Sequence, residues 1–376
     1  MTSNDLRMAI RMAMDLGLYE VFEPYLSEAH VTRARLLFWS LFVNDRILAF
    51  KTGRPPTIPE EIIEIPLPTD EDFVAGSARA DIEDEELPQP TPFVYMVRLM
   101  VLCGRITTVL AGCRGEMRTL LPHVGKDYPA KLKELQAELV QFYAQLSGVM
   151  KWSVDAFKNQ EARGHGDSFL TLHLWANTVL AVSFHPELQE RSEGNLSPIT
   201  QNVERSTKAS LRSSRIIAEC LVFADLLASH SYTNAQLTSP FAVQPIYVAS
   251  LAFIYDIKST DFNASADSKS NQSVDNLLST LARQNLAVLT KALQRMEHYW
   301  VGISSVSDIL DQNAAGLGFQ RIDASRKAHL PDLALSDRPP IFINAVYARH
   351  PPVMVVPQVP SALSSSMTLD AGDTSA

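Results

Sequence analysis

The sequence predicts an all-α protein. Apolar residues recur every three or four positions along most of the chain, which is the spacing of amphipathic helices. Apolar residues make up 46% and charged residues 20% of the 376 residues, so most of the chain must bury a core. We find no run of period-two strands and no repeat of fixed length. We therefore expect an array of about nine amphipathic helices, with an acidic proline-rich loop and a disordered C-terminal tail.

The expected helices are identified by their apolar faces and by the residues that stop them. Gly17 ends the first helix, and Gly53, followed by two prolines, ends the second. Gly53 is expected to adopt a positive φ. The expected helical segments are residues 5–16, 32–52, 93–120, 130–150, 169–185, 216–227, 243–256, 275–296 and 299–310.

Composition divides the chain into two parts. Residues 1–318 are predicted to form one helical domain, in which an acidic loop occupies about residues 69–92. Polar loops are expected at 187–206 and 258–273, which are rich in Ser, Asn and Asp. Residues 319–376 are rich in Pro, Ser and Ala, and we expect them to form a largely disordered tail.

Charge and cysteine content exclude several classes of protein. The net charge of −9 argues against broad contact with nucleic acid or an anionic membrane, and no signal sequence or apolar run of ~18 residues is seen. Three cysteines are too few for a disulfide scaffold or a cysteine-built zinc site. The nine histidines show no HExxH motif. We expect neither a bound metal nor a cofactor in this chain.

No enzymatic motif stands out. Phosphate loops, dinucleotide fingerprints and nucleophile elbows are absent. The acidic runs at 70–72 and 81–86 suggest a helical metal-dependent enzyme, but such sites need carboxylates on helix walls around a cavity. These acids lie among prolines, so we favour a solvated loop, with an acidic contact for a coactivator as the alternative. We expect no catalytic residues.

Several residues have a structural and a functional interpretation. His173 lies on an apolar face and is expected to be a satisfied core histidine, and His185 to donate to carbonyls at its helix end. Trp39 and Trp175 are expected in the core. The apolar face of the 130–150 helix could be core or a dimer seam, and we favour core. The residues of that face are Leu132, Leu135, Leu139, Phe142, Leu146 and Val149.

The most distinctive local pattern spans residues 33–68. A long helix carries Asp45 and Arg46, stops at a Gly-Arg-Pro-Pro sequence and continues into an extended Ile/Pro segment. We expect Asp45 or Arg46 to pair with a charged or polar group at the edge of the core. Spacing alone indicates a helix, a stop and a proline-stiffened strap, without a function.

This block resembles the hallmark of the fungal-specific transcription factor regulatory domain, found in fungal zinc-cluster activators such as the xylanolytic regulators. Residues 7–19, 172–188 and 213–228 resemble further helices of that family in the same order, with departures at Tyr19, Ala176, Asn177 and Glu187. The resemblance covers roughly residues 5–315. The family-motif candidates, with structural or regulatory roles, are Phe38, Trp39, Asp45, Arg46, Gly53, Arg54, Pro55, Pro56, His173, His185 and Pro186.

The resemblance implies the regulatory half of a fungal transcription factor, located in the nucleus or shuttling with the cytoplasm. Its partners would be transcriptional coregulators or paralogous factors, with a small-molecule effector and a homodimer left open. DNA contact and zinc would come only from an N-terminal zinc cluster, which this sequence lacks, so the domain is expected to be N-terminally incomplete. A truncated paralogue or scaffold that acts by protein–protein interaction is the alternative.

Overall fold

The computed structural model of the chain describes residues 3–21, 27–74, 90–112, 128–185, 200–229, 239–266, 272–297, 299–300 and 302–314. All regular structure in these ranges is helical and none is a strand, which confirms the all-α prediction. The α-helices are α1 (Ser3–Asp15), α2 (Glu28–Thr52), α3 (Glu71–Val74), α4 (Pro92–Gly112), α6 (Tyr128–Ala144), α7 (Val154–Ala162), α8 (Gly166–Ser183), α10 (Thr200–Ser229), α11 (Val243–Ala266), α12 (Gln272–Glu297) and α13 (Ile303–Asn313). Short 3₁₀ turns are η1 (Glu60–Ile62), η2 (Gly148–Met150) and η3 (Pro240–Ala242).

The described ranges hold eleven α-helices where the sequence predicts about nine. The additional helices, α3 and α7, are short, at four and nine residues, so their apolar spacing is too brief to identify them. The helix expected to continue to residue 120 is described as far as Gly112. The predicted tail lies outside the described residues.

Two segments predicted as polar loops are partly helical. α10 begins at Thr200, inside the expected loop 187–206, and α11 continues to Ala266, inside the expected loop 258–273. Residues such as Ser, Thr and Asn cost only about 0.5 kcal/mol each in a helix. A helix that is already nucleated and held by its buried face can therefore extend through them.

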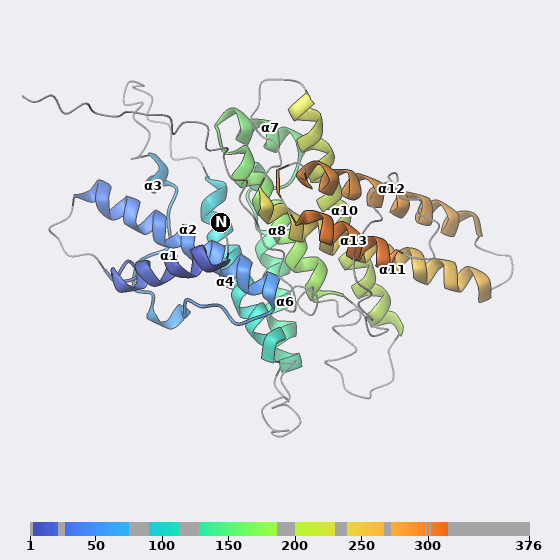
Figure 1. Ribbon diagram of the computed structural model, residues 1–376, viewed down its shortest axis with the longest axis horizontal. Helices are drawn as coiled ribbons and strands as arrows, with labels where there is room; N and C mark the ends of the chain where they lie inside the picture. Colours follow the sequence, from blue (N-terminus) through green and yellow to red (C-terminus); the bar gives the residue numbers. More distant parts are fainter. Residues whose placement is uncertain are drawn as a thin grey trace, which may run out of the picture.

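α8 lies at the centre of the array. Fifteen of its eighteen residues are buried, and it packs against α4, α6, α7, α10 and α11. A helix that is apolar on every side is stable when its neighbours cover it completely. Figure 1 shows α8 between the N-terminal helices α1, α2 and α4 and the C-terminal helices α11, α12 and α13. α8 therefore joins the two halves of the chain.

The α6 face is part of this core. Leu139 is completely buried, and α6 packs on α4 and α8, which confirms the preference for core over a dimer seam. Leu132, Leu135 and Leu146 are also buried. Val149 was wrongly included in the face, because it lies in η2 after the helix has ended and is 43% exposed.

Two stretches are long and apolar enough to cross a membrane by length and composition, Pro92–Ala111 and Pro240–Thr260. Buried residues make up 67% and 72% of them, respectively. The first is α4, which packs between α2, α6 and α8, and the second contains most of α11. Their neighbours in the array account for their apolar composition.

Candidate functional site

Asp45 and Arg46 form a buried ion pair on α2. Both side chains are 1% exposed, and Arg46 Nη1 donates to Asp45 Oδ2 over 2.6 Å. The carboxylate also accepts the N–H groups of Thr57 and Ile58 at 3.0 Å, while Arg46 Nη2 donates to the Ile58 carbonyl at 2.9 Å. The predicted pairing is confirmed, but it lies in the interior and not at the edge of the core. Burying two charges is costly, and these additional hydrogen bonds offset much of that cost.

A glycine on α4 makes room for Arg46. A Cβ at Gly104 would lie 2.6 Å from Arg46 Nε and 2.7 Å from its Cδ. On another side, the guanidinium carbon lies 3.9 Å from the centre of the Phe42 ring. Burial lowers the pKa of Arg46, and the Asp45 carboxylate opposes that shift. Burial raises the pKa of the neighbouring Cys103 thiol to about 12, so this cysteine is not a nucleophile.

α2 ends at the predicted glycine stop. Gly53 has a φ of 62°, which confirms the expected positive value. Its N–H donates to the Phe50 carbonyl, and the N–H of Arg54 donates to the Ala49 carbonyl. These two bonds satisfy carbonyls that the end of the helix would otherwise leave unpaired. The Arg54 side chain is exposed.

The extended segment after this stop packs back along α2. Phe38 and Trp39 are buried, and the Trp39 indole N–H donates to the Pro66 carbonyl at 2.9 Å. Pro55 is exposed and Pro56 is half-buried. The sequence therefore correctly predicts a strap. Its first residues, Thr57 and Ile58, are bound to Asp45 of α2, and Pro66 is bound to Trp39.

The beginning of the acidic stretch is structured, which corrects the prediction of a solvated loop. Asp72 is buried and forms an ion pair with Arg35 of α2. Asp70 accepts hydrogen bonds from the backbone N–H and the hydroxyl of Thr91, at the start of α4. These two carboxylates anchor the ends of the acidic stretch, whose residues 75–89 lie outside the described part.

His173 is the satisfied core histidine that the sequence predicts. It is fully buried on α8, and burial lowers its pKa to about 4. Its Nε2 lies 3.0 Å from the Met150 carbonyl, which can only accept, so Nε2 carries the proton. Its Nδ1 then accepts from the Tyr143 hydroxyl at 3.2 Å, and that hydroxyl accepts from Asn177 Nδ2.

His185, just beyond α8, is also buried, and burial lowers its pKa to about 4. Its ring packs edge-on against Tyr255, with 5.5 Å between the ring centres. Nδ1 has no hydrogen-bond partner among the described residues, so the expected donation to helix-end carbonyls is not found at this atom. The backbone N–H of His185 donates to the Val182 carbonyl instead. Pro186 lies outside the described residues.

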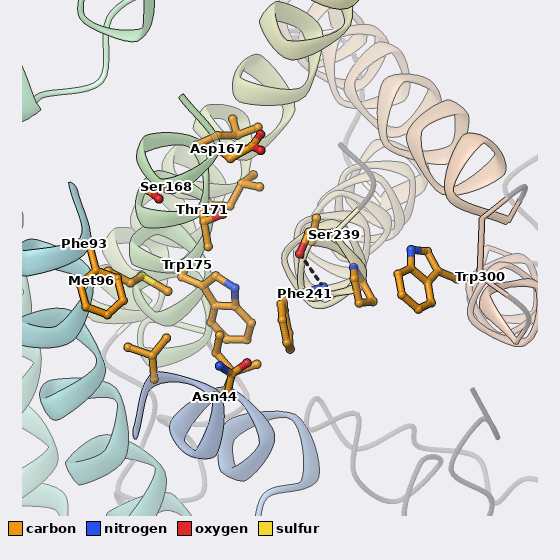
Figure 2. A pocket seen from close by; sticks show the side chains of 16 residues that line it. Asn44, Phe93, Met96, Asp167, Ser168, Thr171, Trp175, Ser239, Phe241 and Trp300 are labelled. Carbon is orange, nitrogen blue, oxygen red and sulfur yellow. Dashed lines mark hydrogen bonds between the residues drawn. The ribbon is translucent and has the colours of Figure 1, made fainter. Parts of the chain in front are cut away.

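A pocket of about 450 Å³ opens between the two halves of the array. One side is formed by Asn44 and its neighbours on α2 and by Phe93 and Met96 on α4, and the other by residues 239–242 with Trp300. α8 supplies the wall between them (Figure 2). This volume is in the range of small-molecule sites, as is the largely apolar and aromatic lining.

The α8 wall carries polar groups along its length, while Asn44 and Ser239 contribute polar side chains on other sides. Figure 2 shows Asp167, Thr171 and Trp175 in succession along the helix. Asp167 is exposed, and partial desolvation raises the pKa of its carboxyl group. Trp175 is fully buried at the inner end, and its Nε1 has no hydrogen-bond partner among the described residues.

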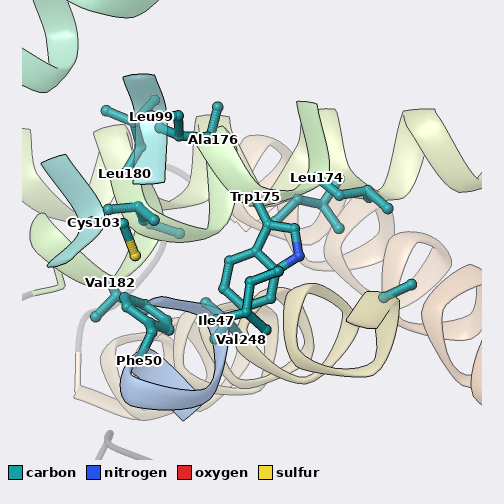
Figure 3. Close-up of a cluster of buried hydrophobic side chains, with 14 of the residues drawn as sticks. Ile47, Phe50, Leu99, Cys103, Leu174, Trp175, Ala176, Leu180, Val182 and Val248 are labelled. Atoms are coloured by element: carbon teal, nitrogen blue, oxygen red, sulfur yellow. The ribbon is translucent and has the colours of Figure 1, made fainter. Parts of the chain in front are cut away.

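Trp175 also belongs to the core beneath the pocket. Its ring meets Phe50 edge-on at 5.8 Å between ring centres. Figure 3 shows the indole beside the labelled side chains of Ile47 of α2 and Val248 of α11, with its nitrogen directed away from Phe50. The expectation that Trp175 is a core residue is thus confirmed, and it also lines the pocket.

Sequence reasoning did not identify the pocket. Its lining comes from positions as far apart as Val43 and Trp300, and no local spacing joins them. The one available signal was the pairing of Asp45 and Arg46, because the same stretch of α2 contributes Val43, Asn44 and Ile47 to the pocket. Among the described residues, no group of three His, Cys, Asp or Glu side chains is placed to hold a metal ion.

The chain matches the fungal specific transcription factor domain over residues 6–141. It is 25% identical over 323 residues to a Zn(2)-C6 fungal-type transcription factor, FTF1c, of Fusarium oxysporum f. sp. lycopersici, covering 78% of this chain and 32% of that protein. The thiamine repressible genes regulatory protein thi1 of Schizosaccharomyces pombe is 31% identical over 27% of this chain and 12% of its own length. Pyrimidine pathway regulatory protein 1 of Saccharomyces cerevisiae is 28% identical over 40% of this chain and 16% of its own length.

The chain spans about a third of the length of the Fusarium relatives. No solved structure matches it. The matched range contains α2 with the buried Asp45–Arg46 pair, the strap that follows it, and α4 with Gly104. Residues 6–141 therefore match the fungal specific transcription factor domain, and the chain is similar to fungal Zn(2)-C6 transcription factors over most of its length.

Proposed function

We propose that this chain is the regulatory domain of a fungal transcription factor and acts in the nucleus without catalytic activity of its own. It binds a small-molecule effector in the pocket beside α8 and passes the bound state to coregulators. DNA binding is supplied by a zinc cluster that these residues do not contain, since three cysteines cannot form a six-cysteine centre.

The main support for this proposal is that the pocket is lined in part by α2, which lies in the part of the chain that matches the family. Asp45 and Arg46 hold the strap, while the flanking residues Val43, Asn44 and Ile47 line the pocket. A ligand in the pocket would therefore touch the helix that defines the domain. It would also touch residues 239–242 and Trp300 of the C-terminal half.

This arrangement suits a two-state regulator. A ligand that contacts both halves stabilises the arrangement in which they close on it, and the shift is limited by its differential affinity for the two states. α8 is buried by both halves and is the element through which they would communicate.

A transcription reporter tests the proposal. Residues 1–376 are fused to an unrelated DNA-binding module in a fungal host, and reporter output is compared with that of the module alone. We expect the fusion to change the output and the unfolded variant Leu139→Lys to return it to the level of the module. Equal output from the module and the intact fusion would contradict a regulatory role and favour a scaffold that acts away from promoters.

A further inference from the structure

Two of the polar groups that line the pocket, at opposite ends of its α8 wall, make different demands on a ligand. The Trp175 indole nitrogen is only a donor, and leaving a buried donor without a partner is destabilising. Asp167, when ionised, is only an acceptor, and its carboxylate has no hydrogen bond to another described residue. A ligand should therefore place a hydrogen-bond acceptor at the inner end of the pocket, near Trp175, and a donor at its mouth, near Asp167.

Charge near the mouth favours a hydrogen-bond donor such as an amine. The Glu161 carboxylate interacts electrostatically with Asp167, and this repulsion adds to burial in raising the pKa of Glu161. The neighbouring cation Arg163 is turned to other partners, the Pro90 carbonyl and Gln160 Oε1. An amine of the ligand would therefore meet a negative potential at this end.

Spacing along α8 determines the length of the ligand. Eight residues separate Asp167 from Trp175, which corresponds to about 12 Å of helix. Between them, Thr171 faces a gap whose far side carries Phe241 and Trp300 (Figure 2). The aromatic rings in the lining favour a flat molecule, since offset or edge-to-face contacts with rings are favourable.

The indole N–H at the inner end of the pocket is buried. Trp175 Nε1 has no exposed surface, and Figure 2 shows it on the side of the ring that faces Ser239 and Phe241. Phe241 is only half-buried, in the short turn η3. The proposed hydrogen bond therefore requires a side chain at the inner end of the pocket, such as Phe241, to move aside.

We propose that the pocket binds a flat, elongated aromatic molecule that accepts a hydrogen bond from Trp175 Nε1 at its inner end and presents an amine to Asp167 at its outer end. This inference rests on the proposed function and names the chemical class of its effector. A ligand of this kind satisfies both groups at once and fills the apolar space between them.

The probe trans-4-(4-aminostyryl)pyridine has this design, with a ring nitrogen at one end and an aromatic amine at the other. Isothermal titration calorimetry with the full chain should show saturable binding at one site. 4-Aminostilbene, which lacks the acceptor, and 4-styrylpyridine, which lacks the amine, should each bind about fivefold to tenfold more weakly, the equivalent of one lost hydrogen bond.

Matched variants locate the site. Trp175→Phe keeps an aromatic ring but removes the N–H, so it should weaken the probe to the level of 4-aminostilbene and abolish discrimination between the two compounds. Asp167→Asn removes the charged acceptor, so it should weaken binding of the probe to the level of 4-styrylpyridine and abolish discrimination between those two compounds. Trp152→Phe is the control, because Trp152 also has a buried, unpartnered Nε1 but does not line the pocket; its affinity should equal that of the wild type.

The proposal is overturned if the wild-type chain does not bind the probe, or binds all three compounds equally. Equal affinity of folded Trp175→Phe and wild type for the probe would also overturn it. If Trp175→Phe fails to fold, the comparison of the three compounds on the wild type decides alone. None of these outcomes alters the reporter result, so the ligand class and the regulatory role fail separately.

Discussion

At the scale of single residues, the Asp45–Arg46 pair determines how the chain folds back after α2. The two charges are buried together and hold the backbone of Thr57 and Ile58. The sequence predicts that one of them finds a partner, because adjacent opposite charges late in a long amphipathic helix require one. The space for Arg46 is provided by Gly104, 58 positions along the chain, and no local pattern reveals that contact.

Gly104→Ala tests this contact. The new methyl group would overlap Arg46 Nε, so we expect a loss of about 1–3 kcal/mol in the free energy of unfolding. Arg46→Ala leaves the Asp45 carboxylate buried without its counter-charge and should cost about 3–5 kcal/mol. In the Arg46→Ala background, Gly104→Ala should cost almost nothing. Urea denaturation of the four proteins measures the cycle. Strictly additive losses would mean that Gly104 and Arg46 do not interact.

Gly53→Val tests the helix stop. A β-branched residue is strained at a φ of 62°, and we expect a loss of about 1–2 kcal/mol. Gly148→Val is the control, since Gly148 has ordinary backbone geometry and open space around its Cβ position. Thermal melting compares the two variants. If both melt like the wild type, the Gly-Arg-Pro-Pro block is better explained as a surface recognition element.

At the scale of elements, α6 shows how far periodicity carries a prediction. The three- and four-residue spacing from Leu132 to Leu139 correctly predicts a buried face, because one helix side must meet its neighbours; Leu146 is also buried but lies after the helix ends at Ala144. The same spacing cannot show where the helix ends, so Val149 was assigned to a face that it does not share. α8 gives the converse case, since the sequence predicts an apolar face that includes His173, whereas nearly every residue of the helix is buried.

Leu139→Lys tests the placement of α6 in the core. It would bury an unpaired charge at a site with no exposed surface, which should cost about 3–5 kcal/mol and unfold the chain. The adjacent Val140 is 47% exposed, so Val140→Lys should leave the protein folded. Circular dichroism and sedimentation velocity distinguish the two variants. A folded, monomeric Leu139→Lys protein from a dimeric wild type would show that the face is a dimer seam.

At the scale of the whole molecule, two buried histidines link stability to pH. Burial lowers the pKa of His173 and of His185 from 6.5 to about 4. Between these values the unfolded chain binds more protons than the folded chain, so acid favours unfolding. The free energy of unfolding should therefore fall from about pH 6.5 to about pH 4, by up to about 1.4 kcal/mol per pH unit for each histidine.

His185→Phe isolates half of this effect. The phenyl ring can keep the contact with Tyr255, and it removes one group that titrates. Chemical denaturation between pH 7 and pH 5 gives the free energy of unfolding at each pH. In the variant this free energy should depend on pH less steeply than in the wild type, by up to about one bound proton, or about 1.4 kcal/mol per pH unit. Identical slopes for the two proteins would show that His185 titrates normally in the folded state.

The array as a whole was predictable from the sequence, but the pocket was not. Helices follow from local spacing, and the family block follows from a contiguous motif. The pocket depends on how α2, α4, α8 and η3 approach one another. It also depends on Trp175, whose ring packs in the core while its Nε1 has no hydrogen-bond partner among the described residues. Such a group is recognisable only after its surroundings are known.

The most direct test of the account is the reporter output of a fusion whose pocket has been filled. Thr171→Trp places a large side chain midway between Asp167 and Trp175, while Val140→Trp adds the same side chain on the exposed side of α6. We predict that Thr171→Trp melts within a few degrees of the wild type and changes the output of the fusion, and that Val140→Trp leaves the output unchanged. A folded Thr171→Trp fusion with wild-type output would contradict the claim that this pocket regulates transcription.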